Sequence, residues 1–352
     1  MGESIPSLSL PPRQIAEWSA SRDTLDGLDD ASFCRAILPH VSRTFALSVP
    51  YLPPPLDLHV GVGYLLCRIA DTIEDEPYWS GSRRQAAFSL LLMAFARPDL
   101  SEAARPIEEW AGADGAPTTA LMRRATSVFR VLESFPPPTM ACVAECVTEM
   151  ITGMRRMPGA GPSASPTRLF RTIDELEVYC HYVAGVVGIM LTRLFDGFLG
   201  PEVAFASPAR IEQGRRFGLG LQLTNILADR VADTQHGRLY LPDLGPTSDA
   251  TPTVLARALD HLAEALIYSL AVPPEQEGIR CFCLLPLFFA LRTLGRVADW
   301  REGNRTGRPK ISRQEVSDIV AAVTAHVRDD SFLRRLFSRE CAARSESPAR
   351  NT

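Results

Sequence analysis

The sequence lacks the features of several common protein classes. Its formal net charge is −4 over 352 residues, so it has no basic excess of the kind that binds nucleic acid. Its most apolar run, Cys281–Leu291, is far shorter than the roughly twenty residues that span a bilayer. The first residues, Met1–Pro12, are polar and proline-rich rather than typical of a signal peptide. We therefore expect a cytoplasmic protein that is soluble or peripherally membrane-associated, with no nucleic-acid partner and no transmembrane segment.

Signatures of zinc sites, dinucleotide-binding sheets and repeats are missing as well. Among the eight cysteines, Cys142 and Cys146 lie at helical spacing, but no His or Cys partner follows at the spacing of a zinc site. We therefore expect the cysteines to be buried free thiols in a reducing compartment. The sequence also contains no GxGxxG fingerprint, no strand-like alternation and no internal repeat of fixed period.

Helical segments account for most of what remains. Apolar residues make up 46% of the chain, which is enough for a large core. Clusters of Pro, Gly and Ser, such as Pro53–Pro55 and Pro136–Pro138, separate the segments. We expect an all-α protein with one domain over residues 30–345, a polar, proline-rich extension over 1–29 and a disordered tail over 346–352. The expected helices are Pro12–Ala20, Asp30–Val49, Leu56–Glu74, Ser82–Phe95, Thr118–Phe135, Pro138–Met154, Ile173–Phe198, Pro208–Asp233, Pro252–Ser269, Glu277–Trp300, Ser312–Val327 and Ser331–Ala343.

Two acidic motifs are the most informative feature that is present. The first contains Asp71, Glu74 and Asp75, and the second contains Asp229 and Asp233. In each motif, two aspartates four residues apart share one face of an otherwise apolar helix. Mg²⁺ commonly binds one or two carboxylates together with substrate phosphates. Two such helices facing each other would form a clamp for a diphosphate, whereas one motif alone would more simply indicate a solvated acidic face.

Polar residues extend both acidic stripes at helical spacing. Tyr64 and Arg68 extend the first stripe, and Gln222 and Asn225 extend the second. An arginine offers a fork of hydrogen-bond donors that matches phosphate oxygens, and an asparagine can bind a metal or a phosphate. The matching stripes favour a metal–diphosphate site over two solvated helix faces.

Four motifs that follow one another along the chain resemble those of a known family. They are Ser42-Arg43-Thr44-Phe45, Asp71–Asp75, Tyr179–Gly185, and Gln222–Asp233 followed by Gly237-Arg238. In this order the sequence is similar to the squalene and phytoene synthases, head-to-head prenyl transferases, over roughly Phe33 to Val316. The resemblance implies a single-domain isoprenoid synthase fold, in which helices surround a central apolar cavity and two aspartate-rich helices stand at its mouth. Within the family, Tyr179–Phe195 is more similar to squalene synthase than to phytoene or dehydrosqualene synthase.

The resemblance implies a Mg²⁺-dependent squalene synthase. Such an enzyme condenses two farnesyl diphosphates to presqualene diphosphate and reduces this intermediate to squalene with NADPH, and peripheral membrane contact would help to release the product. The alternatives are a head-to-head synthase that makes dehydrosqualene, phytoene or presqualene diphosphate, a terpene cyclase on the same scaffold, and a catalytically silent lipid-binding scaffold. The sequence does not set the substrate length (C15 or C20), the terminating step or the oligomeric state.

Positions within the family motifs imply roles for individual residues. The implied metal ligands or their neighbours are Asp71, Glu74, Asp75, Asn225, Asp229 and Asp233. The implied substrate-binding residues are Ser42, Arg43, Phe45, Tyr64, Arg68, Gln222, Asn225 and Arg238. The implied catalytic residues are Asp71, Asp75, Asp229 and Asp233, together with Tyr179 near the cyclopropane-forming centre and Phe282, whose ring could stabilise a cation. For Tyr179, a core tyrosine with a hydrogen-bonded hydroxyl is the simpler alternative.

The sequence departs from the family pattern at Ala228, and the role of one basic loop is undecided. The family usually has a basic residue between Asn225 and Asp229, where this chain has Ala228, and Arg230 should point to roughly the opposite side of the helix. A phosphate contact is therefore expected to be missing or to come from elsewhere. The loop Gly303–Arg313 resembles the basic loop near NADPH in squalene synthases. It contains Arg305, Arg308, Lys310 and Arg313, and the resemblance implies that Lys310 and Arg313 bind the cofactor. A solvated basic loop is the alternative.

Overall fold

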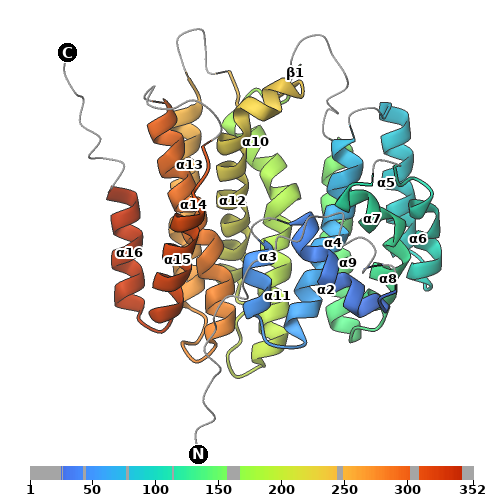
Figure 1. Ribbon diagram of the computed structural model, residues 1–352, viewed down its shortest axis with the longest axis horizontal. Helices are drawn as coiled ribbons and strands as arrows, with labels where there is room; N and C mark the ends of the chain where they lie inside the picture. The colour runs from blue at the N-terminus through green and yellow to red at the C-terminus, as the bar shows by residue number, and fades with distance from the viewer. Residues whose placement is uncertain are drawn as a thin grey trace, which may run out of the picture.

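The structure is a computed structural model, and it describes residues 25, 27–42, 45–76, 79–112, 115–156, 167–243, 249–301 and 309–342. Within these ranges the chain is almost entirely helical, as predicted (Figure 1). The helices are α2 (Asp30–Val41), α3 (Phe45–Ser48), α4 (Leu56–Asp75), α5 (Gly81–Phe95), α6 (Leu100–Glu108), α7 (Pro117–Arg123), α8 (Ala125–Glu133), α9 (Pro137–Arg156), α10 (Ile173–Cys180), α11 (Val186–Leu199), α12 (Pro208–Gln235), α13 (Thr251–Leu270), α14 (Glu277–Arg301), α15 (Arg313–Ala325) and α16 (Asp330–Ala342).

Short elements of other types complete the fold. A 3-10 turn follows α3 at Val49–Tyr51, and a π-helical turn joins α10 to α11 at His181–Gly185. Two strands of two residues each, β1 (Thr167–Arg168) and β2 (Arg238–Leu239), pair in parallel. Over the residues that the structure describes, the chain therefore shows the expected lack of strands except for this pair.

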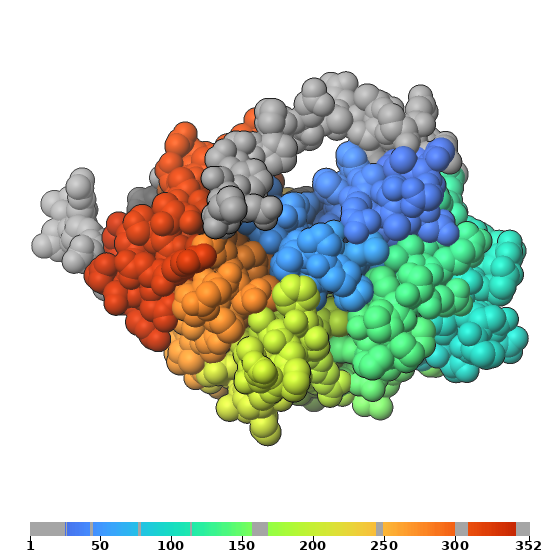
Figure 2. Space-filling view, turned by 90° about the horizontal axis from the view of Figure 1, so that it is seen from below, coloured from blue at the N-terminus to red at the C-terminus, as the bar shows by residue number. Residues whose placement is uncertain are grey.

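The helices form two neighbouring groups, one around α4 and one around α12. Helix α4 contacts α2, α5, α8 and α9, whereas α12 contacts α10, α11, α13 and α14. Helix α11 contacts both α4 and α12, so it joins the two groups. The view from below in Figure 2 shows the yellow-green surface around α11 between the orange of α14 and the green of α9.

Small residues allow α11 and α12 to cross closely. A Cβ atom on Gly188 of α11 would lie 1.9 Å from the backbone oxygen of Gly214 on α12, and one on Gly218 would lie 2.2 Å from the backbone oxygen of Ala184. No side chain fits at these positions without moving one backbone away from the other. Glycine at the crossing therefore sets the separation between the two helices.

Local sequence explains where the two acidic helices begin and end. Helix α12 begins after Ser207, whose hydroxyl accepts a hydrogen bond from Arg210 N, and carries Pro208 in its first turn. It ends before Gly237, whose φ of 79° is favourable only for glycine. Helix α4 begins after Pro55 and ends at Asp75, so its acidic motif occupies the last turn.

The buried core runs through α14. All residues from Ile279 to Leu291 on this helix are buried. All eight cysteines are free thiols, and six of them are buried, which confirms the prediction of free thiols. Only Cys142 and Cys341 are partly exposed.

In the described part of the chain, two helical stretches are long and apolar enough to cross a membrane by length and composition. They are Ile173–Leu199, of which 39% of the apolar window is buried, and Glu277–Asp299, of which 72% is buried. A mostly buried core helix can pass the same test, and α14 is mostly buried. Length and composition alone do not make either stretch a membrane span, and the expected absence of a transmembrane segment stays a prediction.

Several predicted helix boundaries were wrong. The predicted helix Asp30–Val49 ends at Val41, because Ser42 is extended at the C-terminal cap. The predicted helix Thr118–Phe135 breaks at Arg124, whose guanidinium leaves the helix to donate a 2.9 Å hydrogen bond to Leu25 O. Helix α6 was not predicted. The predicted helix Pro12–Ala20, most of the 1–29 extension and the tail 346–352 lie outside the described residues.

Candidate active site

The two acidic motifs approach each other at the ends of α4 and α12. The Asp75 carboxylate at the end of α4 contributes to the raised pKa of Asp233 on α12, so the two charges lie within interaction range. Arg238 lies just after α12, and its Nη1 donates a 2.5 Å hydrogen bond to Asp75 Oδ1. Its Nη2 also contacts the Asp75 backbone oxygen at 3.4 Å. Residues more than 150 positions apart in the sequence are thereby brought together, as the paired motifs predict.

Three carboxyl groups of the motifs have raised pKa values. Burial, opposed by Arg68 and reinforced by Asp75, raises the pKa of Asp71 to about 7. Burial and the charges of Asp75 and Asp71 raise the pKa of Glu74 to about 8. Burial and the charge of Asp229 raise the pKa of Asp233 to about 6, although Arg238 opposes them. Burial is the largest cause of each shift, and the neighbouring carboxylates add to it, so the charged form of these groups is disfavoured despite the nearby arginines.

This donor set fits a hard divalent cation. Carboxylate oxygens from two helices, with the exposed Asn225 one turn before Asp229, are the ligands that Mg²⁺ prefers. Among the residues that the structure describes, no three His, Cys, Asp or Glu side chains are gathered closely enough to form a complete metal site. Mg²⁺ does not require a complete protein cage, because it keeps several water molecules and takes further ligands from substrate phosphates.

Arg68 places a positive charge beside the first acidic motif. Its Nη1 lies 3.9 Å from Asp71 Oδ2, too far for a strong hydrogen bond. Its Nε is buried and has no hydrogen-bond partner among the described residues. A buried donor without a partner is costly, and an anion at this point could accept its hydrogen bond.

The predicted residues Phe45, Tyr64 and Phe282 form one aromatic cluster. The Phe45 ring stacks on Tyr64 at 5.1 Å between centroids and meets Phe282 edge-to-face at 5.5 Å. The Tyr64 hydroxyl donates a 3.1 Å hydrogen bond to Val41 O, and the Ser42 hydroxyl accepts one from Ala46 N at 3.3 Å. Tyr64 and Ser42 therefore hold the α2–α3 connection against α4. Arg43 lies outside the described residues.

Tyr179 lies in a second aromatic cluster close to the first acidic motif. Its ring centroid is 5.3 Å from that of Phe170 and 5.6 Å from that of Tyr240. Burial, the charge of Glu74 and the neighbouring Tyr240 hold the pKa of Tyr179 well above its usual value. Burial also raises the pKa of Tyr240 to about 12. A neutral, buried hydroxyl is thus placed near Glu74.

Sequence reasoning missed Phe170 and Tyr240. Tyr240 follows the predicted Arg238 by two residues, and its aromatic character so close to a motif residue was an available signal. No signal in the sequence singled out Phe170, because its position depends on the pairing of β1 with β2.

The second acidic helix has the departure that the sequence indicated. Ala228 is buried, and Arg230 points away from the motif, as predicted from the helical angle. Its Nη1 donates a 2.9 Å hydrogen bond to Thr251 Oγ1 and lies 3.6 Å from Asp249 Oδ1. Gln222 is half-buried on the same helix. Arg230 therefore does not replace the missing basic residue.

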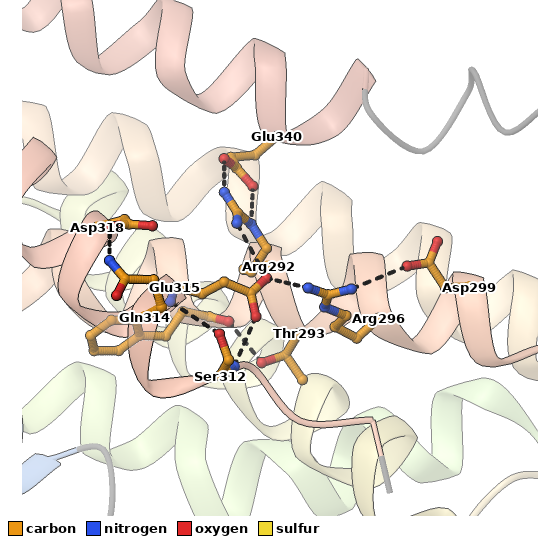
Figure 3. A network of polar contacts seen from close by, with 10 residues as sticks. Arg292, Thr293, Arg296, Asp299, Ser312, Gln314, Glu315, Asp318 and Glu340 are labelled. Atoms are coloured by element: carbon orange, nitrogen blue, oxygen red, sulfur yellow. Dashed lines mark hydrogen bonds and ion pairs between the residues drawn. The ribbon is translucent and has the colours of Figure 1, made fainter. Parts of the chain in front are cut away.

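Lys310 and Arg313 are exposed at the start of α15, on either side of the capping residue Ser312. An ion-pair network holds this helix onto α14 and α16 (Figure 3). Glu315 pairs with Arg296 at 2.6 Å and with Arg292 at 3.3 Å, and Arg292 also pairs with Glu340 at 2.7 Å. Arg305 and Arg308 lie outside the described residues, so Lys310 and Arg313 are the described part of the predicted cofactor loop.

Comparisons with known proteins agree with these motifs. The family model for squalene/phytoene synthase matches residues 38–244. A probable squalene synthase of Neurospora crassa is 31% identical over 312 residues, which cover 80% of this chain and 61% of that protein. The squalene synthase of Homo sapiens is 27% identical over 283 residues, which cover 74% of this chain and 62% of the human protein. The chain thus spans about three fifths of the length of these relatives.

Solved structures show the same fold. TcSQS with the ligand E5700 matches with a TM-score of 0.73 at 22% identity, over 92% of this chain and 93% of that chain. A dehydrosqualene synthase in complex with a ligand matches with a TM-score of 0.57 at 21% identity, over 87% of this chain and 99% of that chain. At such low identity the likeness shows a shared fold.

Proposed function

The chain belongs to the squalene/phytoene synthase family of prenyl transferases, and from this membership we propose that it is a squalene synthase. It would condense two farnesyl diphosphates head to head to presqualene diphosphate and reduce that intermediate to squalene with NADPH. The observation that carries the proposal is the meeting of the two acidic motifs, in which Asp75 interacts with both Arg238 and Asp233. The relatives named squalene synthase in Neurospora crassa and Homo sapiens support this choice of product.

The acidic motifs and Arg68 would bind and orient the diphosphates. Mg²⁺, when bound, would supply positive charge to the departing diphosphate and so favour ionisation. Asp71, Asp75, Asp229 and Asp233 would hold it, with Glu74 and Asn225 as further ligands or neighbours. Arg68, with its buried Nε, would donate to diphosphate oxygens, and Ser42, Arg43, Gln222 and Arg238 would assist.

The two aromatic clusters would act on the hydrocarbon part of the reaction. The faces of Phe45 and Phe282 would lie along a prenyl chain and stabilise cationic character by their π-electrons. Tyr179 would sit near the carbon that loses its proton as the cyclopropane closes, where its neutral hydroxyl can receive or relay that proton. The buried rings of Phe282, Tyr179 and Phe170 would help to keep water away from the cation.

The reductive step and the setting of the enzyme complete the proposal. NADPH, when bound, would supply the hydride, and Lys310 and Arg313 would hold its phosphate from the exposed start of α15. The protein would act in the cytoplasm, soluble or peripherally attached to a membrane that takes up the apolar product.

Product analysis tests this function. The purified protein receives farnesyl or geranylgeranyl diphosphate with Mg²⁺, with and without NADPH, and the products are identified by gas chromatography–mass spectrometry. We expect squalene with NADPH, and presqualene diphosphate or its dehydrated or hydroxylated descendants without it. A product independent of NADPH would instead indicate a head-to-head synthase that ends without hydride, and a cyclic product of one farnesyl diphosphate would indicate a terpene cyclase.

Matched carboxylate variants test the clamp itself. Asp71→Asn and Asp229→Asn should each lower turnover by about three or more powers of ten in a folded protein, because each loses a charged metal ligand. Asp57→Asn on α4 and Glu212→Gln on α12 are the controls, because these carboxylates pair with Arg35 and Arg215 away from the motifs. Near-normal activity of either motif variant at saturating Mg²⁺ would contradict the clamp.

A further inference from the structure

A buried histidine lies outside the site just described, at the junction of α10, α12 and α13. The side chain of His261 on α13 is only 6% exposed. Its Nδ1 lies 3.1 Å from Arg216 Nε on α12, and its Nε2 lies 3.2 Å from Glu177 Oε1 on α10. One ring thus links three helices.

The partners of His261 fix its protonation state. The Arg216 guanidinium can only donate, so Nδ1 must accept and the proton must lie on Nε2, which donates to Glu177. Burial, together with Arg216 and Arg215, lowers the pKa of His261, although Glu177 opposes them. The ring is therefore neutral near pH 7 and makes both hydrogen bonds.

The link continues on both sides of the ring. Arg216 Nη1 pairs with Glu264 Oε1 at 2.9 Å, which ties α12 to α13. Arg257 Nε on α13 lies 3.3 Å from the same Glu177 oxygen that His261 contacts. Glu177 therefore receives two contacts from α13, and these fix the outer side of α10.

Glu177 precedes Tyr179 by two residues on a helix of eight residues. A separation of two residues along a helix corresponds to a rotation of about 200° around its axis, so the two side chains leave opposite sides of α10. Glu177 faces α13, and Tyr179 faces Phe170 and Tyr240. Helix α10 is thus held between a polar contact on one side and the aromatic cluster on the other.

The chain after Tyr179 packs closely against α12. The π-helical turn His181–Gly185 follows directly and packs on α12, where a Cβ on Gly185 would lie 2.8 Å from Leu219 Cδ1. A change in the rotation or height of α10 would therefore shift the position of Tyr179. π-helical turns are frequent at functional sites.

We propose that His261 is a positioning residue for Tyr179, acting through Glu177 and the rotation of α10. The proposal rests on the proposed function, since it assigns the effect to the step that Tyr179 serves. Loss of the ring leaves Arg216 Nε without this acceptor and leaves Arg257 as the remaining contact of Glu177 with α13, so α10 is held less firmly on this side and can turn. The Tyr179 hydroxyl then moves relative to the reacting carbon, although no substrate contact is lost.

Kinetics in two backgrounds test the proposal. His261→Leu should lower kcat for presqualene diphosphate formation by about ten- to a hundredfold, with the KM for farnesyl diphosphate changed less than about twofold. His261→Gln, whose amide can both accept from Arg216 and donate to Glu177, should restore most of kcat. In a Tyr179→Phe background, His261→Leu should have little further effect, because the coupled group is already gone.

His326→Leu is the matched control. His326 also lies at a helix junction, where it stacks on Phe332 at 3.7 Å between ring centroids, but it contacts α15 and α16 rather than α10. It should leave kcat unchanged. An equal loss of kcat from His261→Leu in the wild-type and Tyr179→Phe backgrounds would overturn the proposal, because a merely structural role acts on both.

Hydrogen exchange provides a second measurement that does not depend on activity. In the full-length protein, His261→Leu should speed amide exchange over residues 173–185, while His261→Gln and His326→Leu should not. Unchanged exchange of this segment in His261→Leu would overturn the positioning role even if activity fell. If the wild-type protein forms no head-to-head product, the proposed function fails by itself, and the exchange experiment still decides whether His261 holds α10.

Discussion

Replacing Glu315 by glutamine tests the ion-pair network that fixes α15 (Figure 3). Its carboxylate accepts hydrogen bonds from Ser312 N at 2.8 Å, from Arg296 Nη2 at 2.6 Å and from Arg292 Nη1 at 3.3 Å. Burial alone would raise its pKa, but these hydrogen bonds outweigh burial and lower the pKa to about 2. The charged form is therefore strongly favoured by folding.

The expected loss of stability in Glu315→Gln follows from the size of this pKa shift. A fall in pKa from 4.5 to about 2 corresponds to about 3 kcal/mol of stability at neutral pH. Glutamine keeps one acceptor oxygen, and Arg292 keeps its two hydrogen bonds to Glu340, at 2.7 and 2.8 Å. We therefore expect Glu315→Gln to lower the free energy of unfolding by about 2 to 3 kcal/mol at about pH 7.

The direction of the pKa shift determines how the stability contributed by Glu315 changes with pH. Because the folded-state pKa is depressed, the carboxylate contributes its stability above the unfolded value of 4.5 and loses it as the pH falls toward about 2. Urea unfolding followed by circular dichroism should show the deficit of Glu315→Gln shrinking between about pH 5 and about pH 3. Asp318→Asn is the control, since this exposed carboxylate on the same helix accepts a single 2.7 Å hydrogen bond from Gln314.

The result that would refute this reasoning is equally definite. If Glu315→Gln and Asp318→Asn were equally stable at neutral pH, or if the deficit of Glu315→Gln stayed constant down to about pH 3, the network would not provide the stability assigned to it. The same variant also bears on the cofactor. Glu315 and Ser312 form a capping box at the start of α15, beside Lys310 and Arg313, so loss of this box should raise the KM for NADPH and leave the first half-reaction intact.

Three further outcomes are expected. Tyr179→Phe should lower kcat for the cyclopropane-forming step by about a hundredfold or more with little change in KM, whereas a variant that keeps kcat and loses only stability would identify Tyr179 as a core residue. Gly188→Ala should lower the midpoint of thermal unfolding, because its Cβ would lie 1.9 Å from a backbone oxygen of α12, whereas Gly197→Ala on the same helix meets nothing within 4 Å and should be neutral or stabilising. Burial raises the pKa of Asp71 to about 7 and that of Glu74 to about 8, so deprotonation destabilises the metal-free protein as the pH rises. Mg²⁺ with pyrophosphate should therefore raise the midpoint of thermal unfolding more at about pH 8 than at about pH 6. Equal shifts at the two pH values would contradict this expectation.

The acidic stripes and the helical class could be predicted from the sequence because both depend on spacing along one helix. Residues four apart share a face wherever the helix lies, so Asp71 and Asp75 could be paired without knowing the fold. The family resemblance implied that Phe45 binds substrate and that the Phe282 ring could stabilise a cation, and the structure places the two rings 5.5 Å apart. The individual catalytic and binding roles remain predictions.

The remaining features depend on contacts that no local pattern encodes. Thr118–Phe135 reads as one helix, but Arg124 turns out of it to bind the backbone at Leu25, and this tertiary contact outweighs helix propensity. The link from His261 to Glu177 joins residues 84 positions apart. Either residue alone in the sequence would be read as a polar position on a helix surface.

The shortest regular element of the fold explains how part of the site is assembled. A pair of two-residue strands is too small to be stable alone, so side chains around it must hold it. Arg168 on β1 donates a 2.5 Å hydrogen bond to Leu241 O beyond β2, and Leu169 N donates a 3.0 Å hydrogen bond to Leu239 O. These contacts extend the pairing past the strands on the side where the aromatic residues follow.

The consequence is that one pairing places groups for both halves of the site. Arg238 on β2 reaches Asp75, which ties the second acidic helix to the first. Phe170 and Tyr240 each follow their strand closely, and both rings pack on Tyr179. The acidic motifs and the aromatic residues around Tyr179 therefore share a support, so a displacement of the β1–β2 pair would disturb both. Under the proposed function this coupling would matter, because the cation formed as the diphosphate departs would have to react beside the aromatic residues before water reaches it.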